Sequence, residues 1–482
     1  MGEVGTPENP IRVAIVGSGP AGFYAAEHLL RDEERGVEVD MYDRLPTPYG
    51  LVRAGVAPDH PKIKSVIRVY EKTAARPGFR FFGNVEVGSD VSVEELRRHY
   101  NAVLFSYGTS VDNKLGIPGE DLAGSHSATE FVNWYNAHPD FADRSYDLSC
   151  KRVVVIGNGN VAADVARMLA LPREELEETD TADHAIEALA NSEVEEIVVL
   201  GRRGPAQAAF TNPEVRELGE MTQADVIIDP ADMELDEISS AYVESDDCDP
   251  TNRRNVEIFT DFSQRTPEGK KQRIVLRFLC SPIEIQGGDR VERVAIGRNE
   301  LVESDGRVSA RDTGEREEIE CGMVLRSIGY RGLPLEGLPF DEGRGLIPNE
   351  GGRITDPDSG EQIPGLYANG WIKRGPSGVI GTNKKDAQET VSNLLEDLDA
   401  GRIPAASDEL DHAGLEAWLT ERVSDHITFE HWRNIDAAEV AAGEPHGRPR
   451  VKFVSVEEMV EAGRPDAASS ASRPGAARKA PA

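Results

Sequence analysis

Two glycine-rich turns in this sequence could bind the phosphates of dinucleotides. The first, Gly17 to Gly22, follows the apolar segment 11–16, and the second, Gly157 to Ala162, follows the apolar segment 153–156. Glycines in such a turn permit a tight bend and allow a pyrophosphate to approach the amides at the N-terminus of the next helix. The sequence therefore predicts two nucleotide-binding units.

The end of the next predicted strand indicates which nucleotide the first unit binds. This strand, 37–42, is followed by Asp43. A carboxylate at this position can accept a hydrogen bond from a ribose 2′-hydroxyl, whereas it would repel a 2′-phosphate. We therefore expect the first unit to bind NAD or FAD.

The second unit carries arginines where the first carries an acid. Its corresponding strand, 196–200, is followed by Arg202 and Arg203. A guanidinium binds phosphate through a planar pair of donors, so these residues suit the 2′-phosphate of NADP. The acidic, helix-prone segment 173–196 would account for the long separation between Gly157 and Arg202. A solvated pair of arginines is the alternative.

Two further segments could contact a bound ring system. The loop 45–61 could place His60 near a flavin, where an imidazole can donate a hydrogen bond or shuttle a proton, although a capping or core histidine is the alternative. The segment 375–383 opens a helix, and its glycines suit the partial negative charge of a reduced flavin. Trp371 could shape the nicotinamide pocket or belong to an interface.

The composition excludes several classes of protein. Four cysteines lie far apart, without a CxxC pair or metal-ligand spacing, so we expect buried free thiols and no metal site, cysteine-bound cluster or dithiol relay. The net charge of −33 argues against nucleic acid as a partner, because phosphate binding requires clustered basic residues. No segment approaches the roughly 20 apolar residues of a membrane span. We expect a cytoplasmic protein that does not bind membranes.

These candidate sites require alternating strands and helices to position them. Runs typical of strands occur at 102–106, 274–279 and 323–328, and helical patterns occur between such runs, as at 91–100. We therefore predict an α/β fold with two Rossmann-like, three-layer dinucleotide-binding domains. The predicted segments are 10–107, 108–329 and 330–464, followed by a disordered tail, 465–482, rich in Ala, Ser, Pro and Arg.

Five blocks of sequence resemble the adrenodoxin reductase family of ferredoxin–NADP⁺ reductases, especially its actinobacterial members. The resemblance covers residues 10 to about 462, and its most specific blocks are 46–64, 157–167, 201–211, 371–386 and 442–452. The family fold is of the adrenodoxin reductase and glutathione reductase type. It implies that 10–107 and 330–464 form an FAD-binding domain and that 108–329 forms an NADP-binding domain.

The resemblance also implies the residues of both sites. Those that would hold FAD are Gly17, Gly19, Ala21, Gly22, Asp43, Leu51, Val87, Trp371, Gly378, Val379 and Ile380. Those that would hold NADP(H) are Asn158, Gly159, Asn160, Val161, Arg202, Arg203, Glu214 and Gly378. His60, Asp164 and Glu214 match positions around the reacting rings, and we expect orienting and proton-relay roles for them.

The chain departs from the family in a few places. Asp43 replaces the usual Glu, and Asn113, beside Lys114, stands where some relatives have an arginine. Such reductases dock an acidic ferredoxin on a basic face, yet this chain is strongly acidic. Basic residues that could form such a face, or simply a solvated cluster, are Arg253, Arg254, Arg265, Lys270 and Lys271.

The activity implied by the resemblance is hydride transfer from NADPH to FAD, followed by single-electron transfer to a ferredoxin-type iron–sulfur protein. Cofactors supply such chemistry, and the protein supplies geometry and electrostatics. Because the sequence has no cysteine-rich module, we expect the acceptor to be a separate chain. The alternatives are a flavin reductase of a small acceptor such as a quinone, and a sensor that binds both nucleotides without turnover.

Overall fold

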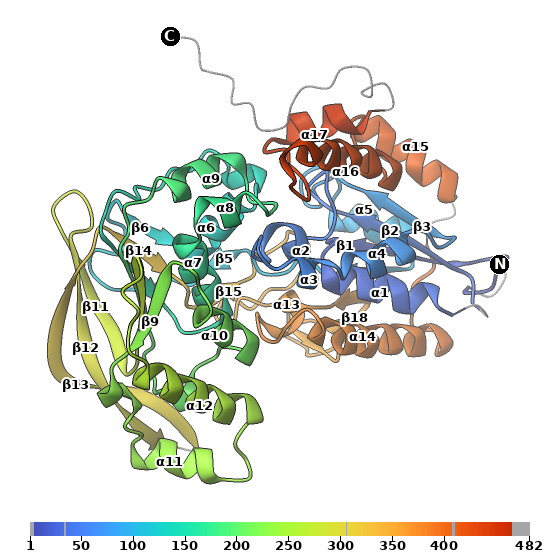
Figure 1. Ribbon diagram of the computed structural model, residues 1–482. Helices are drawn as coiled ribbons and strands as arrows, with labels where there is room; N and C mark the ends of the chain where they lie inside the picture. The colour runs from blue at the N-terminus through green and yellow to red at the C-terminus, as the bar shows by residue number, and fades with distance from the viewer. Residues whose placement is uncertain (1–3, 33–34, 305, 407–409, 465–482) are drawn as a thin grey trace. The chain divides into compact units, whose positions relative to one another are not determined.

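The computed structural model in Figure 1 describes residues 4–32, 35–304, 306–406 and 410–464. The chain divides into two compact units. Unit 1 comprises Met1–Val111, Asn136–Asp140 and Tyr330–Ala482, and unit 2 comprises Asp112–Tyr135 and Phe141–Gly329. The predicted disordered tail, 465–482, lies outside the described residues.

Unit 1 is built on a seven-stranded sheet with the strand order β16-β17-β18-β4-β1-β2-β3. The strands from β18 to β3 are parallel, and β17 and β16 continue the sheet antiparallel. The strands are β1 Ile11–Val16, β2 Val37–Tyr42, β3 Phe79–Phe82, β4 Ala102–Phe105, β16 Asn349–Glu350, β17 Arg353–Thr355 and β18 Gln362–Ala368. Two short strands, β5 Val111–Asp112 and β15 Tyr330–Arg331, pair separately.

Both faces of this sheet are buried, as in a three-layer fold. Val13 and Ile15 of β1 belong to one hydrophobic cluster, whereas Ala14 and Val16 belong to another. Successive side chains of a strand point to opposite faces, so the two clusters lie on the two sides of the sheet. Helices α1, α4, α14, α16 and α17 contribute to the first cluster, and α5 and α15 contribute to the second.

The helices of unit 1 include one, α14, of 18 residues. Their bounds are α1 Pro20–Leu30, α2 Leu51–Ala54, α3 Pro61–Lys64, α4 Ile67–Ala74, α5 Val93–His99, α13 Trp371–Arg374, α14 Thr382–Asp399, α15 His412–Arg422, α16 Phe429–Gly443 and α17 Val456–Gly463. Short 3₁₀ turns are η1 Pro139–Phe141 and η4 Glu444–His446. Helix α1 begins with Pro20 because proline fits the first helical position, where its missing N–H is not needed.

Unit 2 contains a six-stranded parallel sheet with the order β6-β14-β7-β8-β10-β9. Its strands are β6 Ser125–Ser127, β7 Arg152–Ile156, β8 Glu196–Leu200, β9 Ala224–Ile228, β10 Gln272–Arg277 and β14 Met323–Arg326. A three-stranded antiparallel sheet consists of β11 Cys280–Gln286, β12 Arg293–Ser304 and β13 Arg307–Glu320. Residues of both sheets share one hydrophobic cluster, so the smaller sheet covers one face of the larger.

The helices of unit 2 include the acidic segment expected between the second glycine turn and the arginine pair. Their bounds are α6 Ala128–Tyr135, α7 Asn160–Ala170, α8 Arg173–Leu176, α9 Asp183–Ala190, α10 Asn212–Leu218, α11 Glu237–Glu244 and α12 Pro250–Gln264, with 3₁₀ turns η2 Pro205–Gln207 and η3 Pro230–Met233. Strands β7 and β8 pair directly, so α8 and α9 occupy the crossover between them. This extra pair of helices explains the long separation of Gly157 and Arg202.

The structure confirms the predicted class of fold and corrects some of its details. The predicted strand 274–279 ends at Arg277, because Leu279 has a positive φ of 54° and the chain turns into β11. The predicted strand 323–328 ends at Arg326. The three-stranded sheet was not predicted, and its strand β13 is mostly exposed and has no apolar face. No helix in the described ranges is long and apolar enough to cross a membrane.

Candidate functional site

The first glycine turn joins β1 to α1 and leaves open space at the helix N-terminus. Gly17 has φ +105°, and a Cβ atom there would lie 2.6 Å from the carbonyl oxygen of Ser106. A Cβ atom at Gly22 would lie 2.2 Å from the Gly17 oxygen, whereas one at Gly19 would meet nothing within 4 Å. Gly19 caps α1 without a side-chain hydrogen bond. The amides of this turn therefore face a space that fits a phosphate group.

Asp43 is tied to the same turn from the end of β2. Its Oδ2 accepts hydrogen bonds from the Ser18 amide at 2.9 Å and the Ser18 hydroxyl at 2.5 Å, and its Oδ1 accepts one from the Leu45 amide at 3.0 Å. A carboxylate offers about four acceptor positions, so capacity remains for one more donor. The shorter side chain that replaces the family's Glu is thus held at the turn itself, where a ribose hydroxyl could reach it.

The proline-rich loop after β2 lies against the glycine turn. The Tyr49 amide donates to the Ser18 carbonyl at 3.0 Å, and Tyr49 has φ +87°, which is rare for a residue other than glycine. The following residue, Gly50, lies so close to Gly19 that a Cβ atom would be 3.0 Å from the Gly19 Cα. The loop continues into α2, where Leu51 is 39% exposed, and to His60, which is buried and precedes α3.

A buried ion pair holds this loop to the C-terminal helices. Arg53 donates to both carboxylate oxygens of Glu439 on α16, at 2.9 and 2.5 Å, and its guanidinium lies over the ring of Trp432. Burial alone would raise the pKa of Glu439, but Arg53 and Arg450 outweigh it, so the pKa is below its ordinary value. Glu439 is therefore ionised, and the segment 442–452 contributes to this network through Arg450.

The end of β18 contacts the start of α1. The Asn369 side-chain amide donates to the Ala21 carbonyl at 2.8 Å. Gly370 has φ +73°, its amide donates to Asp386 at 2.6 Å, and a Cβ atom there would lie 2.6 Å from the Ala21 Cβ. Trp371 follows and stacks on Tyr330, with ring centroids 5.8 Å apart and planes 14° apart.

Several buried polar atoms around these strand ends have no hydrogen-bond partner within the described part of unit 1. They are Ser106 Oγ, Thr109 Oγ1, Asn369 Oδ1 and Trp371 Nε1. Buried polar atoms are nearly always hydrogen-bonded, so these atoms fit a bound molecule that has donors and acceptors. Ser106, Thr109 and Asn369 were not among the predicted site residues. Ser106 and Asn369 directly follow parallel strands, and polar residues at such positions are a signal for ligand binding in open α/β sheets.

Other residues predicted to contact FAD lie in loops around the same sheet. Val87 is buried in the loop after β3. Gly378 has φ +80°, and the Val379 amide donates to the Thr382 hydroxyl at 3.1 Å. The Val379 side chain is 55% exposed, and α14 begins shortly after Ile380 without a side-chain cap. An exposed apolar side chain such as that of Val379 suits contact with the apolar ring system of a cofactor.

The second glycine turn in unit 2 repeats the first. Gly157 has φ +134°, and a Cβ atom there would lie 2.0 Å from the Ser327 oxygen, whereas Gly159 has open space apart from Ala209 at 3.9 Å. The Asn160 side chain accepts from the Thr211 amide at 2.8 Å, so residues after the arginine pair stabilise the turn. Among the described residues, the buried Asn158 Nδ2 has no partner. Val161 follows on α7.

Arg202 and Arg203 directly follow β8, the neighbour of the strand that carries this turn. Neither guanidinium has an ion-pair or hydrogen-bond partner in the described parts of the chain, and Arg202 is exposed. Burial and the adjacent Arg202 lower the pKa of Arg203, which shows that its positive charge is uncompensated. Two uncompensated guanidiniums beside a glycine turn make a site for a second anionic group of the nucleotide.

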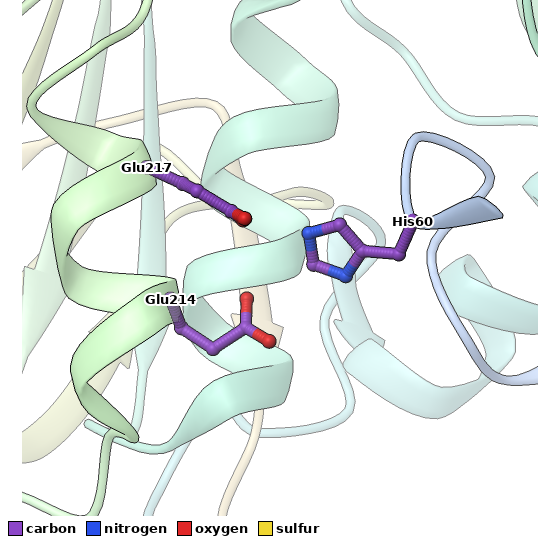
Figure 2. Close-up of side chains that lie close together, drawn as sticks. All are labelled: His60, Glu214 and Glu217. Atoms are coloured by element: carbon purple, nitrogen blue, oxygen red, sulfur yellow. The ribbon is translucent and has the colours of Figure 1, made fainter. Parts of the chain in front are cut away.

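The structure brings Asp164 and Glu214 together through Arg167. The Arg167 guanidinium donates to Asp164 at 2.7 Å and to Glu214 at 3.3 Å, and it lies 3.7 Å from Glu217. Figure 2 shows Glu214 and Glu217 extending from α10 toward the same side. Glu214 is buried. Since a buried guanidinium stabilises nearby negative charge, these carboxylates suit the role of fixed hydrogen-bond acceptors.

The departures from the family pattern have local partners. The Asn113 amide and side chain donate to the carbonyls of Gly329 and Ile328, and Lys114 pairs with Asp121 at 3.6 Å.

The five basic residues considered for a ferredoxin face are mostly paired with nearby groups. Arg254, Arg265 and Lys270 pair with Glu257, Asp261 and Glu268, and Arg253 donates to two backbone carbonyls, whereas Lys271 has no ion pair within the described ranges.

All four cysteines are free thiols, as expected. Cys248, Cys280 and Cys321 are buried, and Cys150 is half-buried. Burial raises the pKa of Cys321 to about 12, so this thiol is protonated at neutral pH.

Comparison with known proteins places these features in a family. Residues 11–199 match the pyridine nucleotide-disulphide oxidoreductase model. The chain is 51% identical over 465 residues to the NADPH-ferredoxin reductase FprA of Mycobacterium leprae, covering 95% of this chain and 99% of that protein. It is 42% identical over 472 residues to mitochondrial NADPH:adrenodoxin oxidoreductase of Salvelinus fontinalis, covering 95% and 92%. The structure of Mycobacterium tuberculosis FprA in complex with NADPH superposes with a TM-score of 0.88 at 51% identity, covering 94% of this chain and 100% of that one.

Proposed function

The chain belongs to the family of NADPH-dependent ferredoxin and adrenodoxin reductases, and on this basis we propose that it passes electrons from NADPH, through FAD, to a ferredoxin-type iron–sulfur protein. FAD supplies the redox step, because it accepts a hydride from NADPH and releases electrons one at a time. The protein binds both nucleotides and excludes water from them. The observation that carries this proposal is the set of unpaired buried polar atoms at the ends of β4 and β18.

In unit 1, we assign the binding of FAD to the glycine turn and the loops around the sheet. The amides after Gly17 and Gly19 hold the pyrophosphate, and Asp43 accepts from the ribose. Leu51, Val87, Trp371 and the turn Gly378–Ile380 surround the rest of the cofactor. The segments 10–107 and 330–464 form this FAD-binding domain.

In unit 2, we assign the binding of NADP(H) to the second turn and the arginine pair. Asn158, Gly159, Asn160 and Val161 lie at the start of α7, where amides and the helix dipole favour a pyrophosphate. Arg202 and Arg203 bind the 2′-phosphate, which explains two cations without partners among the described residues. The segment 108–329 forms this domain.

The three residues predicted around the reacting rings differ in the roles that their surroundings support. Arg167 donates a hydrogen bond to each of the carboxyl groups of Asp164 and Glu214 and so holds both in place, and we assign to both the role of orienting the nicotinamide end of the nucleotide. An imidazole has two ring nitrogens that can donate or accept a hydrogen bond, and His60 is buried directly before α3. We assign His60 an orienting and proton-relay role.

The four cysteines bear on both the electron acceptor and the cellular compartment of the protein. We propose a ferredoxin-type iron–sulfur protein as the acceptor, since the four cysteines of this sequence lie too far apart to ligate a cluster of their own. We place the protein in the cytoplasm. Free thiols at all four cysteines fit this reducing compartment.

The test is anaerobic mixing of the purified yellow protein with NADPH and, separately, with NADH. Rapid bleaching of the flavin band with strong preference for NADPH is expected. Cytochrome c reduction is then measured with and without added ferredoxin. A rate that does not respond to ferredoxin would favour a reductase of small acceptors such as quinones, and a flavin that neither coenzyme bleaches would favour a sensor without turnover.

A further inference from the structure

Helix α14 of unit 1 lies beside β18 (Figure 1) and carries a buried carboxyl group, that of Asp386. Its Oδ2 accepts a hydrogen bond from the Gly370 amide at 2.6 Å. Its Oδ1 lies 3.0 Å from the Lys373 ammonium, and its Oδ2 lies 3.7 Å from Nε of Arg374. One carboxyl group thus contacts a backbone amide and two cations, all of them within the segment 370–374.

Lys373 and Asp386 form an ion pair that is almost fully buried. Both side chains are 7% exposed. The Lys373 ammonium also donates to Glu389 at 2.6 Å and to the Thr390 hydroxyl at 3.1 Å. Replacing a buried ion pair by apolar side chains of similar size is often neutral or stabilising. Stability alone therefore does not explain a charged pair at this place, two residues after Trp371 in the chain.

The position of Trp371 depends on these contacts. Helix α13 begins at Trp371 and consists of four residues, and so short a helix has little stability of its own. Gly370 precedes it with φ +73°, and a Cβ atom there would lie 2.6 Å from the Ala21 Cβ. Asp386 binds the amide of this glycine and the side chain of Lys373 near the end of α13. Both ends of α13 are therefore fixed to α14 by one carboxyl group.

Arg374 extends the same network to the turn Gly378–Ile380. Its guanidinium donates to Asn383 Oδ1 at 2.8 Å and to the carbonyl and hydroxyl of Ser377. The Asn383 side-chain amide in turn donates to the last carbonyl of the turn at 3.2 Å. Asp386 is thus connected to both segments of this region that we assign to the binding of FAD.

We infer that Asp386 is a positioning residue of the FAD site and that its charge lowers the reduction potential of the bound flavin, an inference that rests on the proposed function. A reduced flavin carries partial negative charge, so cations close to it favour the reduced form and raise the potential. Lys373 and Arg374 are cations within three residues of Trp371. Asp386 offsets their charge, and salt screens buried charges only weakly. The carboxylate therefore keeps the flavin a stronger reductant.

The test compares Asp386→Asn with the matched control Asp399→Asn. Each substitution replaces one carboxylate of α14 by an amide. Asp399 lies at the far end of this helix, about 20 Å along its axis, and pairs there with Arg35. The midpoint potential of the bound FAD is measured by anaerobic reduction beside a reference dye. The dissociation constant of FAD is measured by titration of the apoprotein.

Asp386→Asn is expected to raise the ratio of reduced to oxidised flavin at a fixed potential on the order of tenfold, which is about 30 mV for a two-electron couple. FAD should bind roughly tenfold more weakly, because one amide group cannot accept from the Gly370 amide and also offset the charge of Lys373. The control should match the wild type in both measurements. An unchanged potential in Asp386→Asn, whatever its affinity for FAD, would overturn the inference.

A double variant separates the effect of charge from that of position. Lys373→Met/Asp386→Asn removes one charge of each sign, so its potential should return close to that of the wild type while FAD binding stays weakened. A potential that remains raised would overturn the role of the charge. If Asp386→Asn binds no FAD, Lys373→Met alone carries the test, because losing a cation should lower the potential, and an unchanged potential would contradict the inference.

The wild type decides the proposed function separately. Wild-type protein that binds no FAD, or whose flavin NADPH does not bleach, would defeat the proposed function. A wild type that binds FAD and is bleached by NADPH leaves that function standing, and the variants at 373 and 386 then test the inference alone.

Discussion

At the scale of single residues, the two proposed nucleotide sites differ in the charge of the side chains that would contact the ribose. Arg202 and Arg203 are adjacent cations without partners among the described residues. The Asp43 carboxylate accepts three hydrogen bonds, two from Ser18 of the first glycine turn and one from Leu45 of the loop after β2. Each charge suits one kind of ribose, phosphorylated or not. Substitutions at these positions should therefore affect one nucleotide and spare the other.

The variant Arg202→Ala/Arg203→Ala should raise the KM for NADPH on the order of 100-fold, because a hydrogen bond to a charged group contributes about 1.5–3 kcal/mol. The KM for NADH should change little. Ferricyanide reduction with each coenzyme measures both values. The control Lys271→Ala/Arg307→Ala removes two exposed cations of the same unit and should behave as the wild type. An equal loss with both coenzymes would contradict a 2′-phosphate site.

The variant Asp43→Asn should weaken FAD binding roughly 10- to 100-fold, because an amide NH₂ would replace an acceptor of the Ser18 donors at a cost of about 1–3 kcal/mol. Titration of the apoprotein with FAD measures the effect. Asp43→Glu keeps the acceptors and should retain most of the affinity. If Asp43→Asn binds FAD as tightly as the wild type, Asp43 does not organise this turn.

At the scale of elements, the loop between β2 and α3 depends on helices from the other end of the chain. The buried Arg53–Glu439 pair and the Lys452 ammonium, which donates to the Arg53 carbonyl at 3.1 Å, tie α2 to the segment after α16. A short helix such as α2 has little stability of its own. The position of Leu51 and His60 therefore relies on this network.

Removing the anion of this pair with Glu439→Gln should destabilise the protein by about 3–5 kcal/mol at neutral pH, because Arg53 would remain buried without a counter-charge. Urea unfolding measures the change, and the exposed Glu336→Gln is the control. Since the folded pKa of Glu439 is lowered, its contribution is complete above the ordinary carboxyl pKa of about 4.3 and declines as the pH falls below that value. The difference in the free energy of unfolding between Glu439→Gln and the wild type should therefore shrink as the pH falls below that value. A difference that does not depend on pH would argue against an ionised Glu439.

At the scale of the whole molecule, acidic charge dominates. The chain has 86 Asp and Glu against 53 Lys and Arg. Many arginines form surface ion pairs, as Arg316 does with Asp312, but the excess of acid remains and repels itself in the folded state. Such repulsion is screened by salt.

The melting temperature should therefore rise by a few degrees when NaCl increases from about 0.01 M to about 1 M, over which the screening length falls from about 30 Å to about 3 Å. Differential scanning calorimetry of the FAD-loaded protein measures this. Sucrose at equal osmolality is the control, since it leaves the charges unscreened. A melting temperature that falls with salt would show that attractive ion pairs outweigh the net repulsion.

The sequence by itself determined the features that depend on neighbouring residues. The glycine turns, the strands 11–16 and 37–42 and the position of Asp43 follow from short-range rules, because φ angles, strand periodicity and helix N-termini are properties of a few consecutive residues. Arg202 and Arg203 were recognisable for the same reason.

Only the tertiary structure decided which distant residues complete the site. Asn369 meets Ala21 across 348 residues, and Arg53 meets Glu439 across 386. The three-stranded sheet β11–β13 likewise covers one face of the six-stranded sheet, although its strand β13 carries little apolar pattern of its own. Such contacts depend on the path of the whole chain and on what each side chain buries, which local preferences do not encode.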